Sequence, residues 1–140
     1  MSTCTVEIDV AADRARTFAY LAEAANQAEW RHDVDTCELT DGAAGTVGAV
    51  YRQANRGQEV EFRITAMEAD SSITWVCAED TTWPVAGTYR LSDTSGGGTR
   101  IAMDLEMTPS GPFILMRPFV PLMVKAQRKK YTAGLQAALG

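Results

Sequence analysis

The sequence predicts an α+β protein in which a curved, seven-stranded antiparallel sheet is covered on one face by a long C-terminal helix. Alternating apolar and polar residues recur from the N-terminus to residue 107, turn-forming residues separate these runs, and the segment after Pro109 is rich in helix formers. At 140 residues the chain has room for one core, so we expect a single domain over residues 1–140.

The first strand and the helices after it are indicated by their side-chain periods. Residues 3–10 alternate between apolar and polar side chains, and a period of two predicts a strand with one solvated face. Asp13 is a suitable N-cap for the segment ADRARTFAYLAEA, whose apolar residues follow helical spacing. A second short helical piece, NQAEW, should end near Trp30.

Six further strands are expected near residues 34–40, 47–55, 58–69, 72–79, 84–93 and 99–107. NRG at 55–57 and SGGG at 95–98 predict hairpin turns, because glycine adopts positive φ without steric cost. ADSS at 69–72 predicts another tight turn. Successive hairpins of this kind predict an antiparallel meander with one buried face.

The apolar stretch FILMRPFVPLMV at 113–124 is too short for a transmembrane segment and carries Arg117 and two prolines. The first turn of a helix tolerates proline, so the long helix should begin near Pro118 or Pro121, after a separate turn or short helix at 111–117. Its inward stripe would comprise Val120, Met123 or Val124, Gln127, Tyr131, Leu135 and Ala138.

Composition excludes several classes of protein. The net charge of −5 argues against a nucleic-acid partner. Three widely spaced cysteines fit neither a disulfide framework nor a zinc pattern, and a single histidine argues against a metal site. With no apparent signal peptide and no cofactor motif, we expect a cytoplasmic protein without a cofactor, and a homodimer is left open.

A helix over residues 121–139 would be about 28 Å long, too little to fill the concave face of a seven-stranded sheet. A cavity is therefore expected between the helix and the sheet, and such cavities bind apolar ligands.

Five stretches of sequence carry a resemblance to a known superfamily. They are VEIDVAADRARTFAYLAEAANQAEW, GTVGAVYR, EVEFRITAMEAD, GTYRLSDTSGGGTRIAMDLEM and the final helix ending in LQAAL. In this order they resemble the START-related, pollen-allergen-like superfamily (SRPBCC), and within it the polyketide cyclase/dehydrase-like branch. The resemblance implies a helix-grip fold. Members include ligand carriers, cyclases, hydrolase-like enzymes and stress-related regulators, so function is not decided by fold.

Aromatic and methionine side chains at inward positions are candidate ligand-binding residues, although each could equally be core packing. Methionine suits a wall that repacks around varied apolar ligands. The candidates are Trp30, Tyr51, Phe62, Trp75, Trp83, Tyr89, Met103, Met116, Phe119, Val120 and Met123. Two alternatives remain for the strand at 47–55: either Tyr51 and Gln53 point inward, or Val50 and Arg52 do. An inward Arg52 would anchor a carboxylate or phenolate ligand.

The main hypothesis is binding of a small hydrophobic ligand, either aromatic, polyketide-like or lipid-like. The alternative is a cyclase or dehydratase-type enzyme, for which Tyr51, Arg52, Tyr89 and His32 are the visible acid–base candidates. An enzyme would require at least two ionisable side chains in the same pocket, and the sequence reveals no convergent pair. A regulatory or interaction module would instead expose a large apolar patch outside the cavity.

Overall fold

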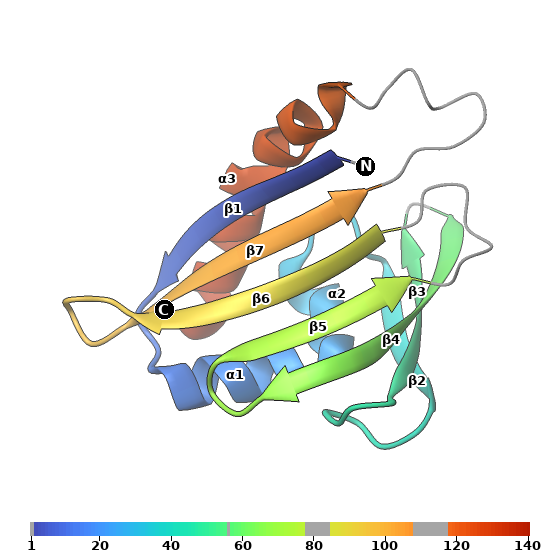
Figure 1. Cartoon of the computed structure of the whole chain (residues 1–140), viewed down its shortest axis with the longest axis horizontal. Helices are drawn as coiled ribbons and strands as arrows, with labels where there is room; N and C mark the ends of the chain where they lie inside the picture. Colours follow the sequence, from blue (N-terminus) through green and yellow to red (C-terminus); the bar gives the residue numbers. More distant parts are fainter. Residues whose placement is uncertain (1, 56, 78–84, 108–117) are drawn as a thin grey trace.

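The computed structural model describes residues 2–55, 57–77, 85–107 and 118–140. Within them, seven strands form one antiparallel sheet in the order β1-β7-β6-β5-β4-β3-β2 (Figure 1). The strands are β1 (Ser2–Val10), β2 (Thr36–Asp41), β3 (Val50–Asn55), β4 (Gln58–Glu68), β5 (Ser72–Cys77), β6 (Val85–Asp93) and β7 (Thr99–Met107). The helices are α1 (Arg14–Ala22), a short 3₁₀ turn (Ala24–Asn26), α2 (Gln27–Trp30) and α3 (Val120–Leu139). The predicted fold class is confirmed.

The strands β2 to β7 form the expected meander, and β1 joins its far edge by pairing with β7. Gly57 and Gly97 have φ of 87° and 84°, and Asp70 has φ of 57°, so all three predicted turns contain a left-handed residue. The strand predicted at 47–55 begins only at Val50. Gly42, Gly45 and Gly48 all adopt positive φ between β2 and β3, and Gly48 and Ala49 each keep one hydrogen bond to Ile64 of β4.

One face of the sheet carries the core, and α1, α2 and α3 lie on that side (Figure 1). The period-two pattern explains this, because alternate residues of β1 and β7 are buried while their neighbours are not. The buried residues on these two strands are Cys4, Val6, Ile8, Val10, Thr99, Ile101, Met103 and Leu105.

Helix α3 runs along β1, the strand at one edge of the sheet. The side chains of Arg128 and Gln136 donate hydrogen bonds to the main-chain oxygens of Glu7 (3.1 Å) and Asp9 (3.0 Å). These bonds occupy carbonyl groups that a sheet edge would otherwise leave without partners. Directly after β1, the N–H of Ala11 donates to the main-chain oxygen of Gly140 at 2.7 Å. The C-terminal end of α3 is therefore fixed to the start of the α1 segment.

The start of α3 agrees with the proline argument. The helix begins at Val120, so Pro121 lies in its first turn, where its missing N–H costs no hydrogen bond. The expected turn or short helix at 111–117 lies outside the described residues.

Gly134 allows α3 to touch the end of α2. A Cβ atom at this position would lie 2.0 Å from the main-chain oxygen of Trp30 and 2.9 Å from its carbonyl carbon. Both atoms belong to the backbone and cannot turn aside as a flexible side chain could. The absence of a side chain at residue 134 therefore permits the close packing of α3 on α2.

We predict that Gly134→Ala destabilises the protein by about 1–3 kcal/mol, because overpacking moves α3 away from α2. Helix propensity alone predicts the opposite, a gain of about 1 kcal/mol. Urea unfolding measures the change. The control is Ala137→Gly, an exposed position on α3, which should lose about 1 kcal/mol through propensity alone. A Gly134→Ala protein more stable than the wild type would show that this contact does not limit the packing.

Candidate ligand-binding site

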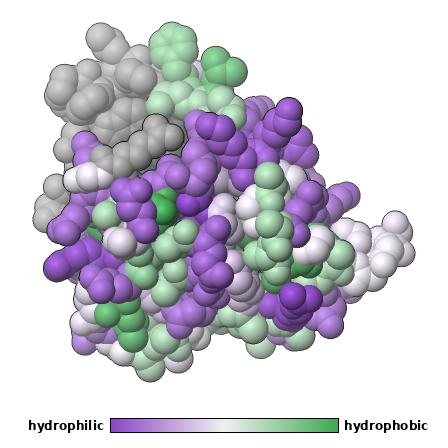
Figure 2. Space-filling view, turned by 180° about the vertical axis from the view of Figure 1, so that it is seen from behind, coloured by the Kyte–Doolittle hydropathy of each residue, from purple (hydrophilic) through white to green (hydrophobic). Residues whose placement is uncertain are grey.

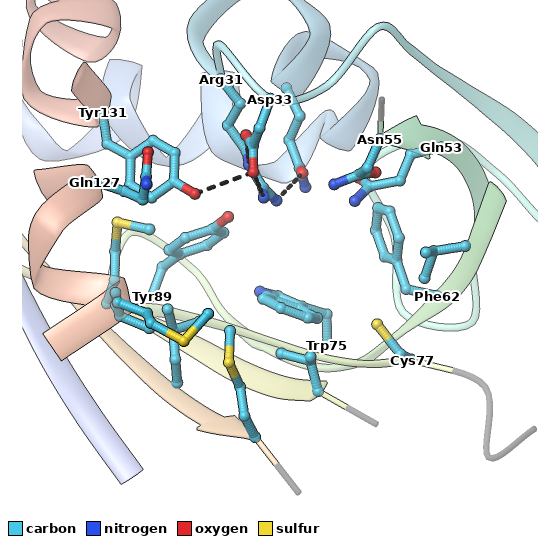
Figure 3. Close-up of a pocket in the computed structure, with 18 of the residues that line it drawn as sticks. Arg31, Asp33, Gln53, Asn55, Phe62, Trp75, Cys77, Tyr89, Gln127 and Tyr131 are labelled. Carbon is cyan, nitrogen blue, oxygen red and sulfur yellow. Dashed lines mark hydrogen bonds and ion pairs between the residues drawn. The ribbon is translucent and has the colours of Figure 1, made fainter. Parts of the chain in front are cut away.

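A cavity of about 400 Å³ lies between the concave face of the sheet and the first half of α3 (Figure 3). This volume is within the range of small-molecule sites. The described residues that line it are Gln27, Arg31, Asp33, Gln53, Asn55, Gln58, Val60, Phe62, Trp75, Cys77, Val85, Tyr89, Met103, Leu105, Met107, Met123, Val124, Gln127 and Tyr131. Four strands in the middle of the sheet, β3 to β6, thus share the wall with β7, α3 and the segment at α2.

The structure brings five of the predicted site residues into the lining: Phe62, Trp75, Tyr89, Met103 and Met123. Trp30 and Tyr51 are buried in the core but do not line the cavity. Phe119, which we expected to face the cavity, is 56% exposed and lies outside the lining. Trp83, Met116 and the side chain of Val120 lie outside the described residues.

The inward face of β3 is the one that carries Tyr51 and Gln53. Both side chains are buried, whereas Arg52 is exposed, so the idea of Arg52 as an anchor is wrong. Tyr51 stacks on Phe62 with ring centroids 5.5 Å apart, and its hydroxyl donates to Glu23 Oε1 at 3.1 Å. Tyr51 therefore supports the wall from behind, through Phe62.

Arg31 and Asp33 form an ion pair in the lining that our sequence analysis missed. The Arg31 Nε and Nη2 atoms donate to the two carboxylate oxygens of Asp33 at 3.1 and 2.9 Å, and Nη1 donates to Gln27 Oε1 at 3.1 Å. The Tyr131 hydroxyl from α3 donates to Asp33 Oδ2 at 3.2 Å. Together these four side chains form a closed polar cluster (Figure 3).

The electrostatics of the cluster favour both charges. Burial alone would lower the pKa of the Arg31 guanidinium, but the oxygens of Tyr131 and Asp33 outweigh burial and raise it. Burial alone would raise the pKa of Asp33, but the hydrogen bonds and charge of Arg31 outweigh burial and lower it. Both groups therefore stay ionised at neutral pH, and their charges cancel.

The other titratable groups in the lining are neutral. Burial raises the pKa of Tyr89 to about 12, and burial also raises the pKa values of Tyr131 and the Cys77 thiol. His32, a candidate acid–base residue, is exposed and does not line the cavity; its ring lies 5.5 Å from that of Tyr131. Among the described lining residues, none of these neutral groups has a pKa shifted toward 7.

Three buried amide oxygens in the lining have no hydrogen-bond partner among the described residues: Gln53 Oε1, Asn55 Oδ1 and Gln127 Oε1. The Trp75 indole N–H interacts with the Tyr89 hydroxyl, although without forming a well-aligned hydrogen bond. Buried polar groups normally find partners, because an unmade hydrogen bond costs about 1–3 kcal/mol. Gln53 and Asn55 come from β3, whereas Gln127 comes from α3 on the opposite side of the cavity (Figure 3). The mostly apolar wall therefore carries polar atoms without hydrogen-bond partners on two opposite sides of the cavity.

Trp75 reaches its position because residue 87 on the neighbouring strand is glycine. A Cβ atom on Gly87 would lie 2.5 Å from Trp75 Cζ2 and 3.1 Å from Leu105 Cδ2. The indole therefore lies flat over the backbone of β6, which leaves the space above it to the cavity.

An apolar group of side chains is exposed where α3 begins. Phe119, Leu122 and Met123 are 56%, 68% and 41% exposed. From behind, an apolar area is visible at this end of the molecule, next to the residues drawn in grey (Figure 2). Met123 also lines the cavity, so this group borders the cavity.

The fold and the cavity together define a helix-grip protein, and the comparisons with known proteins agree. The chain belongs to the polyketide cyclase / dehydrase and lipid transport family, whose model matches residues 1–138. This confirms the resemblance to the SRPBCC superfamily. No sequence among the curated proteins matches the chain.

Solved structures show the same fold at low sequence identity. A START superfamily protein from Mycobacterium smegmatis has a TM-score of 0.80 at 13% identity, over 99% of this chain and 97% of its own. A protein of Helicobacter pylori has a TM-score of 0.80 at 13% identity, over 99% of this chain and 88% of its own. Ara h 8.0201 has a TM-score of 0.70 at 16% identity, over 98% and 96%.

In the described part of the chain, no helix is both long and apolar enough to cross a membrane. Nor does that part hold a group of three or more His, Cys, Asp or Glu side chains arranged to bind a metal ion.

We predict that Asp33→Asn costs about 3–5 kcal/mol at pH 7, because it leaves the mostly buried Arg31 charge without its partner. The pKa of Asp33 is lowered in the folded state, so its contribution is present above the unfolded value of about 3.9 and is lost as pH falls through the folded pKa. The free energy of unfolding of the variant should therefore fall less than that of the wild type as the pH is lowered. Urea unfolding between pH 7 and pH 2 tests both effects.

The control for this variant is Asp93→Asn, since Asp93 pairs with Arg14 at the surface, with side chains 70% and 39% exposed. Such a pair contributes about 0–1 kcal/mol. Equal and small losses in both variants would contradict a structural role for the Arg31–Asp33 pair.

We predict that Gly87→Ala lowers the free energy of unfolding by about 1–3 kcal/mol and moves the Trp75 indole toward the cavity. Thermal unfolding and a crystal structure of the variant measure the two effects. Gly96→Ala is the matched control, because a Cβ atom there meets nothing within 4 Å. If the two variants are equally stable, the indole does not depend on the absence of a side chain at residue 87.

Proposed function

We propose that residues 1–140 form a single domain that binds a small hydrophobic molecule, either aromatic, polyketide-like or lipid-like, in the cavity between the sheet and α3. The observation that carries this proposal is the cavity of about 400 Å³ with its wall of aromatic, aliphatic and methionine side chains. Burying an apolar ligand there would remove apolar surface from water on both partners. Membership of a family described by cyclases, dehydrases and lipid transport supports the same function.

The aromatic wall would determine the shape of the ligand. Phe62 and Trp75 meet edge to face with ring centroids 6.0 Å apart, and Tyr51 supports Phe62 from the core side. Rings held in this way present flat apolar surfaces that favour planar molecules. The methionines from β7 and α3 line the same cavity and can adapt to ligands of different outline.

A test is uptake of the neutral fluorescent probe Nile red, with Val60→Trp as the blocking variant. Val60 lines the cavity and is half-buried, so the added indole should fill the site and reduce probe affinity at least tenfold. The control is Val76→Trp, at a position that is 39% exposed and does not line this cavity. Failure of the wild type to take up the probe, or equal uptake by both variants, would contradict the proposal.

A second candidate is an enzyme of the cyclase or dehydratase type. Its favouring observation is that Arg31, Asp33, Tyr89 and Tyr131 all line one pocket, which meets the requirement for several ionisable groups. Against it, Asp33 is held as a carboxylate by Arg31 and Tyr131, and the raised pKa of Tyr89 makes it a weak acid. Turnover of a linear poly-β-keto thioester that Tyr89→Phe abolishes would favour the enzyme.

The three cysteines support a reducing compartment. Cys4, Cys37 and Cys77 all lie among the described residues, and each is a free thiol. Burial raises the pKa of Cys37 to about 11, which keeps this thiol in its unreactive form. We therefore propose the cytoplasm as the location.

A further inference from the structure

We propose that the ligand is uncharged and carries hydroxyl groups at separate ends of an apolar skeleton, so that the cavity selects neutral diols over carboxylic acids and over bare hydrocarbons. This inference rests on the proposed function, because it concerns the same cavity. Family membership and the apolar wall are both compatible with fatty acids as ligands, and this inference excludes them. The argument uses the charge balance of the wall and its unpartnered polar atoms.

The first step is the charge balance. Arg31 and Asp33 are the two charged residues among the described lining residues, and they neutralise each other through two hydrogen bonds. A ligand carboxylate would meet a cation whose charge is already balanced, and would lie beside the Asp33 carboxylate. Placing a charge in a cavity without a free counter-charge is costly.

The same cluster disfavours a cationic ligand. Asp33 already accepts hydrogen bonds from the Arg31 guanidinium and from the Tyr131 hydroxyl. A ligand ammonium would meet a carboxylate whose charge Arg31 already balances and whose two oxygens already accept three hydrogen bonds. Breaking the pair would leave the Arg31 side chain, which is only 17% exposed, charged and without its partner.

The second step is the set of unpartnered polar atoms. Gln53 is only 6% exposed, and its Oε1 atom lacks a partner among the described residues, as do Asn55 Oδ1 and Gln127 Oε1. Trp75 is 8% exposed, and its N–H has only the Tyr89 hydroxyl nearby, without a well-aligned hydrogen bond. An amide needs both a donor and an acceptor, whichever way it is turned, and an indole N–H needs an acceptor. A hydroxyl group both donates and accepts, so one uncharged group meets every one of these requirements.

The third step is the position of these atoms. The amides of Gln53 and Asn55 lie at the β3 side of the cavity, whereas Gln127 lies next to Tyr131 on α3, and the Trp75 indole lies between them (Figure 3). A ligand with one polar end could reach only one of these sides. A skeleton with a hydroxyl group at each end can satisfy both sides and still bury its apolar middle against Trp75.

The experiment compares four probes that share one skeleton: p,p′-biphenol, p-phenylphenol, biphenyl and biphenyl-p-carboxylic acid. Affinities come from calorimetry, or from displacement of Nile red for the least soluble probe. We expect the diol to bind about tenfold more tightly than biphenyl for each hydroxyl that finds an amide, with the monohydroxyl probe between them. The carboxylate should bind at least tenfold more weakly than the diol at pH 7.

The variant Gln53→Leu then tests the role of the amide. It should weaken binding of the diol about tenfold and leave the affinity for biphenyl unchanged or higher. Without ligand, the variant should be at least as stable as the wild type, since an unpartnered polar group is removed. Arg52→Leu is the control, because it also replaces a polar side chain by leucine, on the exposed face of the same strand, and it should alter none of these affinities.

The outcomes separate the two proposals. Binding of no probe, biphenyl included, would contradict the proposed function itself. Equal binding of biphenyl and the diol, with no effect of Gln53→Leu, would overturn this inference alone and show that water satisfies the amides. Tighter binding of the carboxylate than of the diol would also overturn it, and would show that the Arg31–Asp33 pair opens to receive an anion.

Discussion

The contact between Gly134 and the backbone of Trp30 is the constraint on which the rest of the structure depends. It holds the C-terminal half of α3 against α2, and the hydrogen bond from Ala11 to Gly140 fixes the same end. The buried side chains Leu135 and Leu139 complete this anchor. Every α3 residue that lines the cavity, from Met123 to Tyr131, precedes the anchor. The cavity therefore lies under the part of α3 that precedes Gly134, and Tyr131, which lines it, also packs on Trp30 of α2.

The polar cluster at the α2 end provides the second part of this arrangement. Tyr131 packs edge to face on Trp30 with ring centroids 5.8 Å apart, and its hydroxyl reaches Asp33. The same residue thus connects the helix anchor to the Arg31–Asp33 pair. Because the pair is neutral as a whole, it can stand beside an apolar cavity at lower cost than a single charge. The cavity therefore has a polar cluster without net charge on one side and an aromatic wall on the other.

Much of the fold could be predicted from the sequence because its signals are local. Alternation in residues 3–10 and 99–107 and glycines at the turns specify strands and hairpins without any long-range information. The burial of Phe62, Trp75, Tyr89 and Met103 also follows from strand parity. Which face of β3 points inward could not be decided in this way, since both faces mix apolar and polar residues: Val50 and Arg52 on one, Tyr51 and Gln53 on the other.

The charged part of the site could not be predicted from local patterns, because it depends on a contact between residues that are far apart in the sequence. Arg31 lies in the segment WRHDVD, which is typical of a charged surface loop. Its burial depends on Tyr131, whose partner Asp33 is 98 positions away. Arg31 and Asp33 come together through a turn after α2, in which the N–H of Val34 donates to the main-chain oxygen of Arg31. Phe119 was misplaced because helical spacing gives relative directions only, not the tilt of α3.

The most direct test of the central claim, that a ligand lies between the sheet and α3, is methyl NMR of the protein labelled at methionine. During titration with p,p′-biphenol, the methyl signals of Met103, Met107 and Met123 should shift, because these residues line the cavity from β7 and α3. Met67 on β4 packs against the core but does not line the cavity, so its signal should stay in place. A saturable shift at Met67 with no change at the other three would contradict the account.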